Sequence, residues 1–176
     1  MPSLNRLFLA LILACAALQS GCSLTHAFTK DELQAQLSSR FQFSQNAGLF
    51  SVVVRAPTLR LDGNTNRAGL SLIVEAAGFG RSTVIHADVE GGVDYHADTG
   101  AFFLRDADIK QLEFEGEPGE MRQPLALAAD IAIRLALRDR PIYVLDPNRN
   151  DTEARIRGHL KRVWIEQDRM VVEYHL

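Results

Sequence analysis

Cysteine is scarce in this sequence. The chain of 176 residues has only two, Cys15 and Cys22. If the chain is cleaved just before Cys22, one thiol remains and no disulfide can form within the domain that follows. Small exported domains often depend on disulfides. A domain of this length can bury about 70% of its unfolded surface, so we expect a single domain stabilised by its core alone.

Signatures of catalysis and of nucleic-acid binding are also lacking. No serine lies in a Gly-x-Ser-x-Gly motif, and no glycine-rich loop joins a strand to a helix in the way that phosphate sites require. The net charge is −3 at pH 7, and the basic residues are scattered. A nucleic-acid-binding surface needs clustered basic residues. We therefore expect no enzyme, no cofactor and no nucleic-acid partner.

The apolar run at the start of the chain is too short to span a bilayer. It extends over twelve residues from Leu7 to Leu18, directly after Arg6, whereas a membrane span needs about 20. This length is typical of the hydrophobic part of a secretory signal. The sequence "SGC" (20–22) then fits the bacterial lipoprotein pattern, from which Gln19 departs. The pattern indicates an exported protein.

These features predict how the start of the chain is processed. We interpret residues 1–21 as a lipoprotein signal peptide, Cys22 as an acylated membrane anchor with a short tether over 22–27, and 28–176 as one domain. Ser23, rather than an aspartate, follows the cysteine; the resemblance to bacterial lipoprotein sorting patterns implies the outer membrane and a domain that faces the periplasm. The alternative is an ordinary secretory signal that leaves Cys22 as an unmodified thiol.

A short helix is predicted near the start of the domain, in "FTKDELQAQL" (28–37). Thr29 is a good N-cap and Glu32 lies three residues later, which is the spacing of a capping box. Phe28 and Leu33 flank the cap as a hydrophobic staple does. The helix should continue to about Arg40.

Long strands follow the helix, over 49–62, 68–80, 81–98 and 101–120. They are joined by short turns, so they should form an antiparallel meander. In the first strand the apolar positions change faces around Pro57. Since side chains alternate along a strand, such a change requires a bulge or kink. Strands this long and interrupted in this way predict a strongly curved sheet.

A long helix is predicted over 121–138. Its polar strip, formed by Gln123, Asp130, Arg134 and Arg138, is narrow. A helix that is apolar over most of its circumference is usually enclosed, so we expect it inside the curve of the sheet. A short strand over 141–146 and a hairpin over 161–176 complete the pattern. The whole is an α+β fold: a long, strongly curved antiparallel β-meander wrapped around a long helix in the C-terminal half, with a short N-terminal helix.

The apolar stripe of the long helix and the inward positions of the strands are candidates for the lining of an elongated cavity. Small side chains on the helix leave room for an acyl chain beside it, and a cavity with such a lining would be dry. The alternative is that the same residues form a packed core without ligand. The candidates are Met121, Leu125, Ala128, Ala132 and Leu135 on the helix, with Leu70, Leu72, Val74, Ile85, Val89 and Tyr95 on the strands.

The strand over 81–98 also has a polar face. His86, Asp88 and Glu90 share one side at two-residue spacing, and such side chains can bind a divalent cation. Neighbouring side chains on one face of a strand are about 6.6 Å apart, which is too far for compact coordination. We interpret this side, which continues over 94–98, as the solvated face of a half-buried sheet and expect no metal site.

Three segments resemble a known family, the YceB-like bacterial lipoproteins. They are "FTKDELQAQL" (28–37), "TGAFFLRDADI" (99–109) and "RPIYVLD" (140–146). The fold of this family is similar to that of the tubular lipid-binding (BPI-like) proteins, in which a curved sheet wraps a long helix around a lipid. The resemblance implies an acylated Cys22 and a membrane-anchored protein that binds a lipid or another hydrophobic ligand, and it implies no catalytic residue. The alternative function is an adaptor in envelope assembly.

Overall fold

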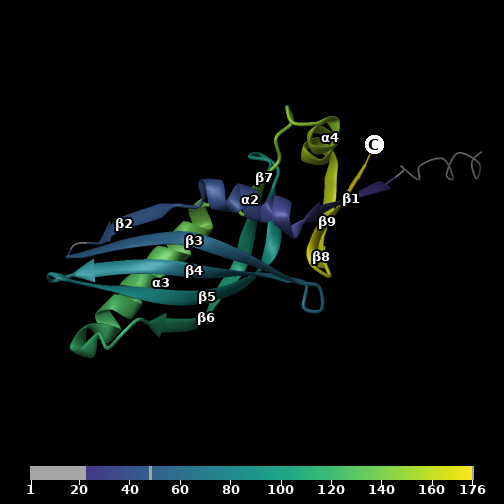
Figure 1. Ribbon diagram of the computed structural model, residues 1–176. Helices are drawn as coiled ribbons and strands as arrows, with labels where there is room; N and C mark the ends of the chain where they lie inside the picture. Colours follow the sequence, from purple (N-terminus) through teal and green to yellow (C-terminus); the bar gives the residue numbers. More distant parts are fainter. Residues whose placement is uncertain (1–22, 48, 176) are drawn as a thin grey trace, which may run out of the picture.

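A computed structural model describes residues 23–47 and 49–175. Within them the chain forms an α+β fold, as the sequence predicted, and its strands form two antiparallel sheets (Figure 1). The larger sheet has six strands in the order β2-β3-β4-β5-β6-β7, and β3 to β6 are the predicted meander. These strands are β2 (Phe43–Ala47), β3 (Phe50–Asp62), β4 (Arg67–Gly78), β5 (Arg81–His96), β6 (Ala101–Phe114) and β7 (Tyr143–Val144).

The predicted bulge in β3 is confirmed at Pro57. The pairing of β3 with β4 shifts in register between Arg55 and Thr58. Val54 before the shift and Leu59 after it are both buried, although their positions differ by an odd number of residues. The bulge therefore keeps both halves of the strand facing the core while the strand bends. Two further register shifts in the pairing of β5 with β6, at 88–92, add to the curvature.

A smaller sheet has the order β1-β9-β8. Its strands are β1 (Ser23–Thr29), β8 (Leu160–Glu166) and β9 (Arg169–His175), and the last two form the predicted hairpin. Residues 23–27 of the expected tether (22–27) do not form a free linker, because they pair with β9 from Ser23↔His175 onwards. β1 is thus formed by backbone hydrogen bonds to the neighbouring strand β9. The sequence showed no strand there because its alternation of apolar residues is weak.

The turns of the two sheets meet at one end of the molecule. The Gly63 amide donates to the carbonyl of Gln167 at 3.1 Å, and the Ile165 amide donates to Oδ1 of Asn66 at 2.7 Å. A Cβ atom at position 63 would collide with the Gln167 backbone, so only glycine permits this approach. The small sheet thus lies across one end of the large sheet. We call this the closed end.

Three α-helices complete the described part of the chain. They are α2 (Lys30–Arg40), α3 (Arg122–Asp139), which follows the 3-10 turn η1 (Gly119–Met121), and α4 (Asp151–His159). The capping box of α2 is present as predicted, since Thr29 and Glu32 bond reciprocally. Helix α3 crosses the large sheet (Figure 1) and packs on β2, β3, β4 and β6. No helix in the described residues has the length and apolarity needed to cross a membrane.

Helix α3 is covered on one side rather than enclosed. Leu127 is 63% exposed and Ile131 is 45% exposed, although the narrow polar strip predicted that the sheet would enclose the helix. The sheet covers the opposite face of the helix and leaves this one to solvent. The residues of α3 that are buried are Leu125, Ala128, Ala129, Ala132, Ile133, Ala136 and Leu137.

Helix α2 links two free edges of the large sheet. β2 pairs with β3 only as far as Val54, so the bulged part of β3 has an unpaired edge. There the Gln34 side chain donates to the Pro57 carbonyl at 2.8 Å and accepts from the Leu59 amide at 2.7 Å. Gln36 makes the same pair of bonds with Val144 of β7, at 3.0 and 2.9 Å. Two amide side chains on one helix thus take the place of missing strands.

Candidate functional site

All of the predicted lining residues except Tyr95 lie in one apolar cluster between α3 and the sheet. Those from β4, together with Ile85 and Val89 of β5, are at most 1% exposed, and Leu125, Ala128 and Ala132 of α3 are also buried. Met121 and Leu135 are half-buried. The structure therefore brings the helix and strand candidates together. Their role as the lining of a ligand cavity stays a prediction.

Tyr95 is the lining candidate that lies apart from the others along β5. Its ring is 5.0 Å from that of Phe102, and its hydroxyl donates to the Arg157 carbonyl of α4 at 2.8 Å. Burial raises the pKa of this hydroxyl above its ordinary value. Tyr95 therefore belongs to the closed end, where it supports α4.

The alanines of α3 set how closely the helix approaches the sheet. Ala129, Ala132 and Ala136 are at most 1% exposed and face the strands. The distance between packed elements depends on the side chains at the contact, and a methyl group adds little to it. The same residues that were expected to leave room for a ligand therefore let α3 lie close against the sheet.

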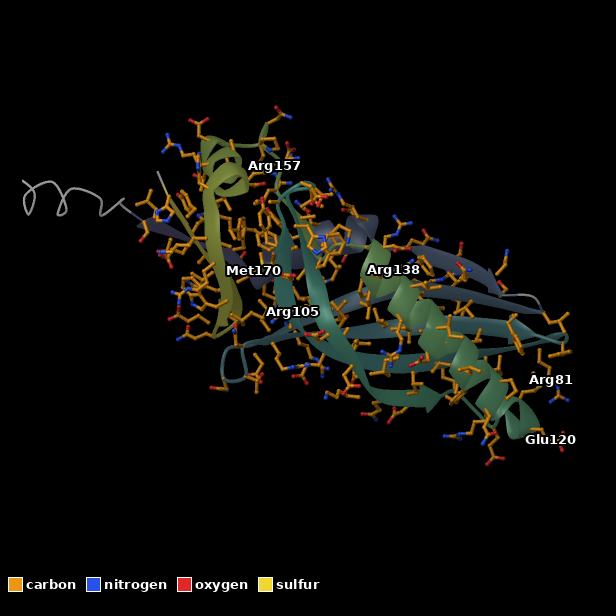
Figure 2. All side chains as sticks on the ribbon, turned by 180° about the vertical axis from the view of Figure 1, so that it is seen from behind. Arg81, Arg105, Glu120, Arg138, Arg157 and Met170 are labelled. Carbon is orange, nitrogen blue, oxygen red and sulfur yellow. The ribbon has the colours of Figure 1, made fainter. Side chains whose placement is uncertain are left out.

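A hollow of about 260 Å³ lies where α3 begins, at the end of the large sheet opposite the closed end. We call this hollow the mouth, and this end of the molecule the open end. Figure 2 shows Arg81 and Glu120 at this end, with Arg157 and Met170 at the other. The mouth is lined by Arg81, Ser82 and Thr83 of β5, by Glu115, Glu117 and Pro118 of the loop after β6, and by Met121 and Leu125.

The mouth has an apolar floor and a charged rim. Leu125 is buried and Met121 is half-buried, so the hollow extends from the surface to the first buried turn of α3. Its rim has charges of both signs, from Arg81 and from Glu115 and Glu117. Such a lining suits an amphiphile, whose apolar part needs the floor and whose polar part needs the rim.

The loop before α3 has two residues in the left-handed region of backbone conformation. They are Gly116, with φ of 78°, and Gly119, with φ of 57°. Side chains at these positions would be strained. The connection from β6 to α3 thus turns sharply beside the mouth.

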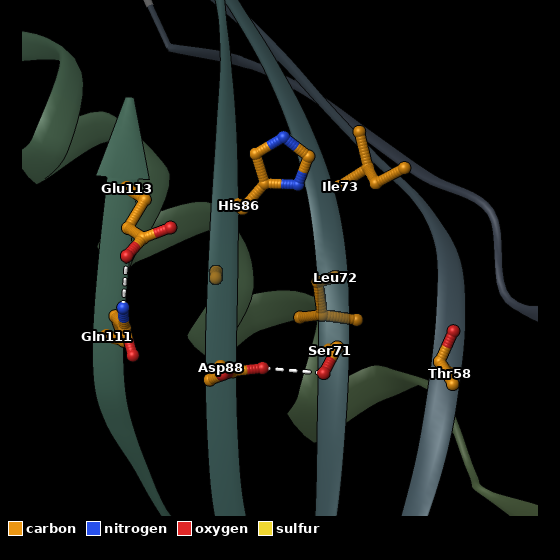
Figure 3. A pocket seen from close by; sticks show the side chains of 9 residues that line it. Thr58, Ser71, Leu72, Ile73, His86, Asp88, Gln111 and Glu113 are labelled. Atoms are coloured by element: carbon orange, nitrogen blue, oxygen red, sulfur yellow. Dashed lines mark hydrogen bonds between the residues drawn. The ribbon is translucent and has the colours of Figure 1, made fainter. Parts of the chain in front are cut away.

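The polar face of β5 surrounds a second hollow, of about 270 Å³, on the other side of the sheet from α3 (Figure 3). Ser71 donates to Asp88 at 2.6 Å, and Gln111 donates to Glu113. Nε2 of His86 lies 2.8 Å from a carboxylate oxygen of Glu115. The remaining residues that line this hollow are Thr58, Leu72, Ile73 and Ala87.

Two acidic residues of this face are paired with basic residues. Asp88 lies 3.5 Å from Arg60, and Glu90 lies 2.7 Å from Arg67. Within the described residues, no three His, Cys, Asp or Glu side chains gather closely enough to hold a metal ion. The face has the ion pairs of a solvated sheet surface.

A buried carboxylate at the closed end was missed by sequence analysis. Glu153 of α4 is 3% exposed and accepts from the Asp146 amide at 2.7 Å and from the Tyr143 hydroxyl at 3.3 Å. Arg149 lies 3.3 Å from the same carboxylate. Burial and the adjacent Glu153 raise the pKa of Tyr143 to about 12. Because its oxygens have donors from the neighbouring loop, Glu153 holds that loop in place.

Two exposed apolar side chains at the open end were also missed. Leu49 is 70% exposed in the turn between β2 and β3, and Phe79 is 64% exposed in the turn between β4 and β5. The sequence holds a signal for both. No charged residue occurs over 41–54 or over 76–80, and turns usually carry polar residues. Apolar residues exposed together on a surface often mark a binding site.

The predicted anchor, Cys22, lies outside the described residues. Ser23, the next residue, begins β1 at the edge of the small sheet. An anchor at this position would adjoin the closed end. If Cys22 were acylated, the closed end would be the part of the domain nearest the membrane.

Comparison with known proteins identifies the family. No curated protein matches the chain. Residues 28–169 match the family described as "Protein of unknown function (DUF1439)". The matched region begins at the end of β1 and extends to the start of β9, so it includes the whole large sheet, α3 and the mouth. Because this match extends over more than half of the chain, the chain belongs to the DUF1439 family.

Proposed function

We propose that the domain binds a lipid or another elongated hydrophobic ligand between α3 and the curved sheet, and that the ligand enters at the mouth. The observation that carries this proposal is the floor of the mouth, where Met121 and the buried Leu125 lead from the surface to the alanine face of α3. The role is binding rather than catalysis.

The volume of the mouth suggests how a ligand would be accommodated. At about 260 Å³ it is just below the range of about 300–1,000 Å³ that is usual for ligand pockets. It would hold the leading part of an acyl chain. A longer ligand would require α3 to move away from the sheet, and the sharp turn at Gly116 and Gly119 is the place where the chain can change direction.

The proposal includes membrane anchoring through acylated Cys22. β1 begins one residue after this cysteine, so the closed end would rest against the membrane. β3 has 13 residues, and at about 3.3 Å per residue it extends for about 40 Å. The mouth would therefore face away from the anchoring membrane. Because Ser23 follows the cysteine, we place the anchor in the outer membrane.

A second candidate function is an envelope assembly adaptor with a filled core. The close approach of α3 to the sheet favours it, since residues such as Val74 and Ala136 are 0% exposed. The two candidates differ in one respect that can be measured. A binder takes up a ligand beside α3, whereas an adaptor does not.

Ligand binding is tested by native mass spectrometry of the protein extracted gently from its own membranes, followed by displacement of a fluorescent fatty acid. We expect a bound lipid in the wild type. Met121→Trp should fill the mouth and weaken fatty-acid binding at least tenfold with little loss of stability. Leu127→Trp is the matched control, because Leu127 is on the same helix but exposed.

Ala128→Trp then separates the two candidates. In a binder it should displace ligand with a modest loss of stability. In a packed core it should overpack and destabilise the fold by about 1–3 kcal/mol. A large fall in melting temperature, with no lipid bound to the wild type, would favour the adaptor.

The anchor is tested by metabolic labelling with palmitate and by cell fractionation. Cys22→Ser should lose the label and should leave a released form or an unprocessed precursor. One acyl chain gives only marginal binding, so a permanent anchor requires more than one. A Cys22→Ser protein that is still processed and still sediments with membranes would contradict the anchor.

A further inference from the structure

Two hairpin turns form one apolar patch at the open end. Leu49 lies in the turn between β2 and β3, and Phe79 lies in the turn between β4 and β5. The turns are adjacent because Phe50 pairs directly with Gly78. The rings of Phe50 and Phe79 meet edge to face, with centroids 5.6 Å apart. We call Leu49, Phe50 and Phe79 the tip patch.

The backbone at Phe79 is unfavourable for a phenylalanine. Phe79 has φ of 52° and Gly80 has φ of 75°, which are the values of a type I′ hairpin turn. Asparagine, aspartate and glycine are preferred in this turn, and a bulky residue with positive φ is an outlier. The side chain is 64% exposed, so little burial offsets the strain. Strained residues of this kind cluster at functional sites.

The chemistry around the tip patch fits a phospholipid surface. A hollow between the two turns is lined by ten described residues, of which Arg81 alone is charged. Insertion of the patch into a membrane interface would thus bury no carboxylate from this hollow. The arrangement combines aromatic and aliphatic side chains for the acyl boundary with one cation for the phosphates.

The position of the patch connects it with the mouth. Arg81 and Ser82 line both the hollow between the turns and the mouth. A bilayer that receives the tip patch would therefore lie next to the mouth, which leads to the contact between α3 and the sheet. Figure 2 places Arg81 at the end of the molecule remote from α4.

We propose that the tip patch docks on the surface of a phospholipid bilayer, with Leu49 and Phe79 at the acyl boundary and Arg81 at the phosphate groups. The docking surface is independent of the proposed function, because a domain can bind a membrane whether or not it takes up a ligand. It is also independent of the proposed anchor, because β1, which follows Cys22 in the sequence, belongs to the closed end.

The test measures flotation of the full chain with Cys22→Ser, which removes acylation, on two kinds of vesicle. One contains phosphatidylethanolamine and phosphatidylglycerol in a ratio of about 3:1, and the other contains phosphatidylcholine. We expect binding to the first kind, weaker binding to the second, and a decrease with salt. Leu49→Ser combined with Phe79→Asn should reduce binding at least tenfold, whereas Arg81→Gln should remove the preference for anionic vesicles.

The double variant cannot fail merely by unfolding at the turn, because asparagine is preferred in type I′ turns. The matched control is Leu127→Ser, which removes an equally exposed apolar side chain on α3. A second measurement uses Phe79→Trp in a Trp164→Phe background. Its fluorescence should shift to the blue on vesicles and should be quenched by brominated acyl chains.

Four outcomes would overturn the proposal. They are no vesicle binding by the Cys22→Ser chain, unchanged binding by the double variant, equal loss with Leu127→Ser, and a dimer that the double variant abolishes in the absence of vesicles. Met121→Trp separates this result from the proposed function. Loss of fatty-acid binding with retained vesicle binding would support docking and ligand uptake as distinct properties.

Discussion

The two ends of the large sheet use the same types of residue in opposite ways. At the closed end, Phe28 is 2% exposed and lies 4.8 Å from the ring of Tyr143. At the open end, Phe79 is mostly exposed and held in a strained turn. Aromatic side chains stabilise the first end through burial, but at the second they remain available to a partner. The contacts that stabilise the fold are thus concentrated at the closed end, where the anchor is proposed.

Polar side chains show the same contrast. Near the closed end, Gln34, Gln36 and Glu153 bond to backbone amides that otherwise lack a partner. At the open end, the polar residues of the mouth belong to the start of β5 and to the loop between β6 and α3. Buried polar groups that are fully bonded rigidify a fold, whereas polar residues on an exposed rim can contact a ligand.

The largest effect is expected at the aromatic cluster of the closed end. Phe28→Ala should destabilise the protein by about 3–5 kcal/mol, because it removes a buried ring and leaves a cavity. Phe79→Ala, the matched change at the open end, should alter stability by less than about 0.5 kcal/mol. Denaturant unfolding of the two variants measures both. Equal losses of stability in the two variants would contradict the difference between the two ends.

The second effect concerns the bridge made by α2. Gln36→Leu keeps the volume of the side chain but leaves the amide and carbonyl of Val144 without partners, so we expect a loss of about 2–3 kcal/mol. Hydrogen exchange should report faster exchange of the Val144 amide. Gln42→Leu, at an exposed position beyond the end of α2, should change neither measurement.

The third effect is a response to alkaline pH. The pKa of Tyr143 is raised to about 12, above an unfolded value of about 10. The neutral form is therefore favoured by folding. Its stabilising contribution is fully present below about pH 10 and is lost as the pH rises through 12. Ultraviolet titration of tyrosinate, compared with Tyr143→Phe, checks this. A Tyr143 signal that titrates near pH 10 in the folded protein would contradict it.

The smallest effect is a gain in stability at the open end. Phe79→Asn places a residue that tolerates positive φ in the type I′ turn, and should stabilise the protein by about 0.5–1 kcal/mol. Thermal unfolding measures the change. A loss of stability would mean that the contact of Phe79 with Phe50 outweighs the strain, and that the tip patch is structural.

The sequence predicted the parts of the fold that depend on local pattern. Thr29 and Glu32 identified α2, and the change of faces around Pro57 identified the bulge in β3. The parts that depend on long-range pairing were missed. β1 is short and its apolar alternation is weak, and it becomes a strand through pairing with β9, which is far away in the chain.

The candidate site was predicted in its residues and less well in its shape. Alternation placed Leu70, Val74 and Ile85 correctly on the inner face of the sheet. The periodicity of α3 did not show that Leu127 would be exposed, because an apolar residue on a helix carries no mark of whether a second layer covers it. The sequence did not predict the mouth, because the start of β5, the loop after β6 and the start of α3 meet there from different parts of the chain.

The bridge made by Gln34 and Gln36 has a consequence for self-association. An unpaired strand edge is a template for the addition of a strand from another molecule, and proteins that expose such edges tend to aggregate. By occupying the edges of β3 and β7 with side-chain amides, α2 withholds both templates from neighbouring chains. Along β6, where β7 no longer pairs, charged residues such as Asp108 and Lys110 serve the same purpose. At these edges the sheet is thus kept from growing into neighbouring molecules.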